Sequence, residues 1–148
     1  MNKVRPTYKS KTLATWIALT CGSLGVHRFY LYGLRDPWGW LFPWPTLLGL
    51  YGVQRARFFG MDDPIAGMLM PLLGLMLAGT MLHAIVIGLT PDDTWNRRFN
   101  GGDRTHRSGW FAVIGVVLAL AFGATALMAT LAFSAQRFFE YQAERAGA

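Results

Sequence analysis

The sequence predicts an all-α, multi-pass integral membrane protein with four transmembrane helices, the first two forming an N-terminal hairpin. Apolar residues make up 53% of the chain and charged residues only 15%, whereas soluble domains carry about 25% charged residues. The stretches 64–91 and 108–136 contain no Asp, Glu, Lys or Arg. Because a helix needs about 20 such residues to cross a bilayer, both stretches are long enough to span one.

The chain divides into four parts by composition. Residues 1–11 form a basic N-terminus, which we expect on the cytoplasmic side, and residues 12–60 form the helical hairpin. A second pair of helices follows over residues 64–135, joined by a polar loop at 90–107. Residues 136–148 form a polar C-terminal tail.

The first predicted span begins at Thr12, and its charge-free part ends at Val26. A helix of that length covers only about 22 Å, less than the roughly 30 Å of a bilayer core. We therefore expect one helix that continues through His27 and Arg28 to about Tyr32. Ionisable side chains are costly at that depth, so they mark a candidate functional position.

The second segment, residues 37–54, has no charge but is interrupted by prolines at positions 37, 43 and 45. These prolines oppose a single continuous helix, and the tryptophans among them suit the headgroup level of a membrane. We favour a short, broken span with a helix from near Pro45 to Phe59. The alternative is a re-entrant or interfacial segment, whose backbone would need protein cover.

The third and fourth spans have clearer ends. Asp63 followed by Pro64 is typical of a helix start, with a capping carboxylate and a proline at the first helical position. This helix should end at about Leu89. The fourth span should begin near Ser108, which we expect as its cap, and end near Phe133. In the loop between them, residues 93–100 could form an amphipathic helix on the membrane, with Trp95 and Phe99 facing lipid.

Basic residues predict the orientation of the chain in a cell (inner) membrane. Eight Lys and Arg residues fall on the side of the N-terminus and six on the other, whether or not the second segment crosses. Because basic residues are retained in the cytoplasm, this excess favours a cytoplasmic N-terminus. It does not choose between three and four spans. The net charge of +6 is explained in the same way, without a nucleic-acid partner.

The most informative motif closes the first segment. Gly22 and Gly25 lie three residues apart, so on a helix they permit close approach by a neighbour. Arg28 lies at a helix C-terminus, where a cation is favoured and where its guanidinium can hold a lipid phosphate. The motif could fold a tight hairpin end, recognise a lipid or partner, or carry ions or protons. Its candidate residues are Gly22, Gly25, His27, Arg28, Phe29, Tyr30 and Gly33.

Together with Lys9-Ser10-Lys11, this motif resembles the first half of the TM2 domain family, of bacterial type. The matching residues are Gly22-x-x-Gly25-x-His27-Arg28-Phe29-Tyr30-Leu31 and Gly33, while Trp40-Leu41-Phe42 with Trp44 looks like the second half. The resemblance covers about Lys9 to Phe59 and implies a two-helix membrane hairpin of poorly defined function. An acidic residue common near the end of the family's second helix is absent, with Gln54 and Arg55 in its neighbourhood.

His83 is a second candidate polar site, inside the third span. It lies seven residues after Met76, so the two share a helix face. Thioether and imidazole groups suit Cu(I), but methionine is an ordinary apolar filler. We therefore predict no metal site. His83 is expected to hydrogen-bond a neighbouring helix or to form a buried proton-responsive site.

The predicted function is structural or interactive, with neither catalysis nor a cofactor. The sequence has no Ser–His–acid set or phosphate-binding loop, and its acids all lie outside the apolar stretches, which disfavours an ion-coupled transporter. We expect the hairpin to dock a membrane lipid, a membrane-protein partner or a second copy of the chain. The alternative is a subunit or oligomer that forms a small ion or solute conduction path using His27, Arg28 and His83.

Overall fold

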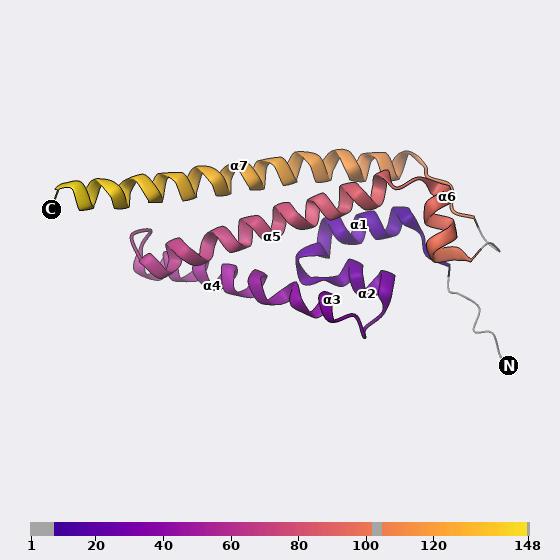
Figure 1. Ribbon diagram of the computed structural model, residues 1–148, viewed down its shortest axis with the longest axis horizontal. Coiled ribbons are helices and arrows are strands. Elements are labelled where there is room, and N and C mark those ends of the chain that lie inside the picture. The colour runs from indigo at the N-terminus through magenta and orange to yellow at the C-terminus, as the bar shows by residue number, and fades with distance from the viewer. Residues whose placement is uncertain (1–7, 102–104, 148) are drawn as a thin grey trace.

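A computed structural model describes residues 8–101 and 105–147, and these residues form helices and turns with no strand (Figure 1). The prediction of an all-α chain is therefore confirmed. Two of the helices, α5 and α7, are long and apolar enough to cross a membrane. In chain order the elements are α1 (Lys11–Cys21), η1 (Gly22–Leu24), α2 (Val26–Tyr32), α3 (Pro37–Leu41), α4 (Pro43–Phe59), α5 (Pro64–Leu89), α6 (Asp92–Trp95), η2 (Asn96–Asn100) and α7 (Trp110–Gly147).

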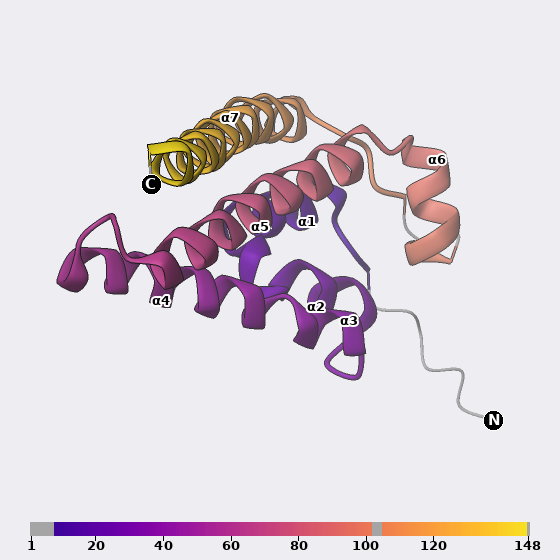
Figure 2. The same cartoon turned by 60° about the vertical axis from the view of Figure 1, so that its left-hand side comes forward.

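The three longest helices pack side by side, with α5 between α4 and α7 (Figures 1 and 2). Small residues allow these helices to approach closely. A Cβ atom on Gly49 of α4 would lie 2.5 Å from Cβ of Leu73 on α5, and one on Gly123 of α7 would lie 2.7 Å from Cβ of Met81. Such close approach is the usual basis of helix packing in membranes.

The first predicted span is not one continuous helix, and that prediction is wrong. Helix α1 ends at Cys21, and the chain turns back so that α2 runs toward the level where α1 began (Figure 1). Two contacts fix this reversal. The backbone N–H of Ser10 donates to the Tyr30 hydroxyl at 2.9 Å, and Lys9 Nζ donates to the carbonyl of Leu31.

Gly25 is the physical reason for the reversal. Its φ is +76°, a left-handed conformation that a residue with a Cβ rarely adopts. A Cβ at this position would also overlap the carbonyl oxygen of Gly39 on α3. Gly22 is packed just as closely on another helix, since its Cβ would lie 2.9 Å from Cβ of Thr80 on α5. Both glycines permit the expected close approach, but toward different helices.

The ends of α4 and α5 lie near the predicted positions. Helix α4 begins at Pro43, two residues before the proline expected at its start, and ends at Phe59. The Asp63 carboxylate caps α5 by accepting from the backbone N–H of Ala66 at 2.9 Å, and α5 ends at Leu89. These boundaries follow from proline geometry and capping chemistry, which act over a few residues.

Helix α7 is longer than predicted. It begins at Trp110 and continues past Phe133 to Gly147, so the tail is part of the same helix. Glu140 accepts hydrogen bonds from Gln136 and Arg137, which are neighbours on the helix surface and support this extension. Ser108 donates to the Asp92 carboxylate from both its backbone N–H and its hydroxyl.

An ion pair between a buried lysine and a partly exposed aspartate joins α1 to α6. Lys11 is 3% exposed, and its Nζ donates to the Thr90 carbonyl at 2.7 Å and to Asp92 Oδ1 at 2.6 Å. Burial raises the pKa of Asp92, but the hydrogen bonds from Lys11 and Ser108 lower it more strongly, so the net pKa lies well below its ordinary value of 3.8. The carboxylate therefore stays ionised at neutral pH.

The segment after this ion pair packs on protein, and the prediction that Trp95 faces lipid is wrong. Trp95 is 2% exposed, its indole N–H donates to the Lys9 carbonyl at 2.9 Å, and its ring packs 4.5 Å from that of Phe99. The amphipathic spacing of this segment predicts which face is buried, but it does not identify whether lipid or protein packs on that face. The N-terminal segment supplies the cover because it offers a carbonyl to the indole.

Substitution of Gly25 should destabilise the protein more than substitution of another glycine with positive φ. Gly25→Ala adds both backbone strain and a steric overlap, whereas Gly33→Ala, at φ +87° with no neighbour within 4 Å of a Cβ, adds strain alone. Strain costs about 1–3 kcal/mol at either position, and the overlap with the Gly39 carbonyl oxygen adds to this cost at Gly25 alone. Thermal unfolding in detergent should rank wild type, Gly33→Ala and Gly25→Ala in order of falling stability. Equal values for the two variants would contradict the packing of Gly25 on α3.

Removal of the Lys11–Asp92 ion pair should destabilise the protein and change its acid sensitivity. Lys11→Met should cost about 1–2 kcal/mol, because the Asp92 carboxylate loses its charged donor but is partly exposed and still accepts from Ser108. Since the pKa of Asp92 is lowered on folding, its contribution is present above about pH 4 and is lost as the pH falls through the lowered pKa. Between pH 6 and pH 3 the melting temperature of wild type should fall further than that of Asp92→Asn. Parallel decreases would refute this role of Asp92.

Candidate functional site

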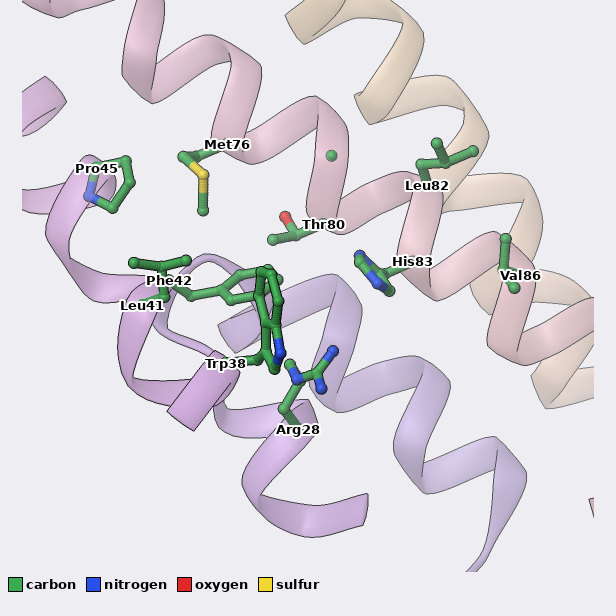
Figure 3. A pocket seen from close by; sticks show the side chains of 11 residues that line it. Arg28, Trp38, Leu41, Phe42, Pro45, Met76, Thr80, Leu82, His83 and Val86 are labelled. Atoms are coloured by element: carbon green, nitrogen blue, oxygen red, sulfur yellow. The ribbon is translucent and has the colours of Figure 1, made fainter. Parts of the chain in front are cut away.

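A cavity of about 710 Å³ lies between the N-terminal helices and α5 (Figure 3). Most of its lining is apolar, and Trp38, Leu41, Phe42, Met76, Leu82 and Val86 contribute to it. Arg28 and His83 lie toward one end, whereas Pro45 and Met76 lie toward the other (Figure 3). The cavity is open on one side, so it can admit a largely apolar molecule with a polar group at one end only.

Arg28 is held in place by an acidic neighbour that the sequence analysis did not single out. Its Nε donates to Asp36 Oδ2 at 2.6 Å across the turn after α2, and its guanidinium lies 5.2 Å from the centre of the Tyr32 ring. The hydrogen bond from Arg28 holds the pKa of Asp36 below its ordinary value. The two Nη groups make no hydrogen bond to the described residues, and the guanidinium lies on the His83 side of the cavity (Figure 3).

His27 and His83 lie against each other although they come from different helices. Their ring centres are 5.4 Å apart, and the Phe42 ring lies 5.4 Å from that of His27 and 5.9 Å from that of His83. His27 is 1% exposed, and neither ring nitrogen makes a hydrogen bond of regular geometry to the described residues, although the Gly22 backbone is close enough for a weak one. An unmet buried polar group costs about 1–3 kcal/mol, so this ring is a candidate for contact with a bound molecule.

A second cavity, of about 170 Å³, adjoins the first. The two share Arg28, His83 and Val86 as lining residues. The smaller cavity is more polar, and His27, Tyr32, Thr94 and Arg98 also line it. Arg98 reaches it from η2 and donates from Nη2 to the Tyr32 hydroxyl at 3.0 Å. The α2, α5 and α6–η2 segments thus converge on this cavity.

The structure brings together three of the predicted site residues and separates them from the rest. His27, Arg28 and His83 meet at the boundary of the two cavities. The expected face shared by Met76 and His83 is confirmed, because both line the larger cavity. The expected hydrogen bond from His83 to a neighbouring helix is not found among the described residues, and its ring packs on His27 and Phe42 instead.

The remaining motif residues build the hairpin rather than line the cavities. The Phe29 ring packs 5.2 Å from that of Trp40 and lies over Gly39. The Tyr30 hydroxyl accepts from the Ser10 backbone, as described above, and Gly33 ends α2 by donating to the Phe29 carbonyl at 2.9 Å. Their roles are structural in this fold.

Sequence reasoning missed Tyr32, Asp36, Thr94 and Arg98 as parts of the site. The pairing of Arg28 with Asp36, eight residues apart across a glycine turn, could have been considered from the spacing alone. Arg98 gives no such signal, because its approach to α2 depends on how the loop after α5 folds back.

A scan against protein-family models, a search of curated proteins and a search of solved structures each found no match to this chain. The resemblance to the TM2 domain family therefore stays a prediction.

Replacement of His27 by leucine should cost little stability, because it removes two polar nitrogens that make no hydrogen bond of regular geometry. The matched comparison is His106→Leu. His106 is also buried, but Tyr8 Oη lies 2.9 Å from its Nδ1 and Thr12 Oγ1 lies 3.4 Å from its Nε2. That variant should lose about 1 kcal/mol or more. Thermal unfolding in lipid-free detergent compares the two, and a larger loss for His27→Leu would show that its ring has a stabilising partner.

Proposed function

We propose that this chain is a multi-pass protein of the cell membrane that docks an acidic membrane lipid. One acyl chain would occupy the large cavity, with the acidic headgroup near Arg28. The observation that carries the proposal is the apolar cavity of about 710 Å³ with its cationic and polar residues gathered toward one end. No covalent chemistry is required of the protein.

The membrane arrangement that best fits the helices has three spans and one re-entrant hairpin. Helix α5 has 26 residues and would extend about 39 Å, more than the roughly 30 Å of a bilayer core. Helix α7 runs beside it and would be a second span. Helix α4 would be the third, although its 17 residues extend only about 26 Å, so the bilayer would have to thin around it. Helices α1 and α2 would enter and leave on the same side, with their backbone covered by protein, as a re-entrant segment requires.

The distribution of basic residues supports a cytoplasmic N-terminus in this arrangement. With α1 and α2 re-entrant, Arg28 and Arg35 join the basic residues at the end where α1 begins. Among the described residues, that end holds Lys9, Lys11, Arg28, Arg35, Arg97, Arg98 and Arg107, and the opposite end holds Arg55, Arg57, Arg137 and Arg145. Over the same described residues, four spans with a continuous first helix would give only six against five, and basic residues favour the cytoplasmic side.

A lipid suits the large cavity better than a soluble metabolite does. The lining offers few polar contacts, so a polar metabolite would lose its hydration without new hydrogen bonds. An acyl chain has no hydrogen-bonding groups, so it loses no hydrogen bonds to water when it enters the cavity. The cavity also lies along α5, the helix most able to cross a bilayer, so lipid could enter from the side.

The conduction path remains a second candidate because His27 and His83 are in contact beside a polar cavity. Imidazoles in contact can relay protons. Reconstitution in vesicles with a pH-sensitive dye would test it, since a relay should give a proton flux that His83→Ala abolishes. A flux no greater than that of protein-free vesicles would exclude this function.

A bulky side chain at position 79 should block lipid docking without unfolding the protein. Gly79 lines both the large cavity and the apolar cavity between α5 and α7, and a Cβ there would have no neighbour within 4 Å. Gly79→Phe should therefore lower the amount of lipid that copurifies in mild detergent several-fold, as quantified by mass spectrometry. Its melting temperature in lipid-free detergent should stay near that of wild type.

The matched control adds the same ring elsewhere. Ala124→Phe places it in a different apolar cavity, between α5 and α7, and should leave the copurified lipid unchanged. Full retention of lipid by a folded Gly79→Phe variant would count against the large cavity as the docking site.

A further inference from the structure

We propose that the smaller cavity is a phosphodiester site that holds the headgroup phosphate of the docked lipid, an inference that rests on the proposed function. The site lies between α2, α5 and the α6–η2 segment, at the end of the large cavity marked by Arg28 and His83. It therefore specifies which chemical class of acidic lipid the protein would take.

The positions of the two cavities along α5 match the length and polarity of a lipid. Met76, Gly79 and Thr80 line only the larger cavity of the two, whereas Ile87 and Thr90 line only the smaller. From Met76 to Thr90 the chain rises about 21 Å at 1.5 Å per residue. Thr90 follows the last residue of α5, where the polar segment begins. A lipid with its acyl chain toward Met76 would thus place its phosphate at the membrane surface.

Several donors around the smaller cavity can make hydrogen bonds or ion pairs beyond those that they make to the described residues. His27 is buried, neither ring nitrogen makes a hydrogen bond of regular geometry, and a neutral imidazole still carries one N–H. The Arg28 guanidinium uses Nε for Asp36 and keeps its Nη groups. No carboxylate of the described residues forms an ion pair with Arg98. An oxyanion in the cavity would supply acceptors to these groups.

The arrangement of the donors favours a tetrahedral oxyanion over a planar carboxylate. His27 and Arg28 approach from α2, His83 from α5, and Arg98 from η2. Because these groups come from three different elements, we expect them to reach a ligand from different sides, and a phosphate group presents oxygens in several directions. The volume of about 170 Å³ equals roughly five to six water molecules at about 30 Å³ each. A phosphate group fits in that space.

The fixed charges favour a diester over a monoester. Arg28 and Arg98 bring two positive charges, and Asp36, which is paired with Arg28, brings one negative charge. Lys9 does not line the cavity and donates to the Leu31 carbonyl at its edge. Among the lining residues and their ion-pair partners, the remaining single positive charge matches the one negative charge of a phosphodiester. A phosphomonoester carries about −1.5 to −2 at neutral pH, so it would leave negative charge uncompensated.

Lipid titration of the full chain tests the site. Delipidated protein in mild detergent would be titrated with phosphatidylglycerol and with diacylglycerol, fatty acid and phosphatidic acid of the same chain length. Inorganic phosphate would be titrated alone. Thermal shift would give apparent affinities, and native mass spectrometry would count bound lipid. Phosphatidylglycerol should bind most tightly, and inorganic phosphate should give no shift at the same concentration.

Two arginines on the same segment provide a matched pair of variants. Arg98→Gln should weaken phosphatidylglycerol binding about tenfold, since it removes a charged donor, and should leave diacylglycerol binding unchanged. Arg97→Gln removes the same charge from the neighbouring residue, which does not line either cavity, and should change the affinity less than twofold. Both residues are exposed, so both variants should fold.

Each contrary outcome has a distinct meaning. Equal binding of diacylglycerol and phosphatidylglycerol, insensitive to Arg98→Gln, would overturn the phosphate site and leave the proposed acyl-chain cavity intact. Tighter binding of fatty acid or phosphatidic acid would overturn the phosphodiester assignment. Stabilisation by inorganic phosphate alone would make free phosphate the ligand and overturn the lipid source. Binding of none of the lipids would refute the proposed function itself.

Discussion

The reversal of the chain at Gly25 is the constraint on which the rest of the structure depends. It returns α2 to the level where α1 begins, and this brings His27 and Arg28 against α5 instead of carrying them across a membrane. Gly22 packs η1 closely on Thr80 of α5, and the cavities lie where α2 and α3 face α5 beyond this contact. A continuous first helix would have carried the same two side chains about 26 Å from the start of α1.

Local chemistry predicted much of the fold. The capping of α5 by Asp63 and the break before α4 follow from carboxylate and proline geometry, which a sequence displays directly. The all-α class follows from the two long apolar stretches. The error at Gly25 has a physical origin: helical spacing of Gly22 and Gly25 is equally consistent with a packing face and with a turn. Only the contact with Gly39, fourteen residues later, decides between them.

The site could be predicted only in part, for a similar reason. His27, Arg28 and His83 drew attention because ionisable groups are costly within apolar segments, and they do meet in space. Arg98 and Thr94 are ordinary residues of a polar loop until the Lys11–Asp92 ion pair and the Trp95–Lys9 hydrogen bond fold that loop over α2. Such long-range contacts leave no periodic signal in a sequence.

The length of α7 also limits how the protein can sit in a bilayer. Its 38 residues extend about 57 Å, nearly twice the hydrocarbon thickness of about 30 Å. A tilt that buried the whole helix would have to approach 60°, beyond the 0–40° range of membrane helices. In the proposed membrane arrangement, part of α7 would therefore project into water. The charged and aromatic residues after Gln136 would stand clear of the headgroups on the side opposite the lipid phosphate.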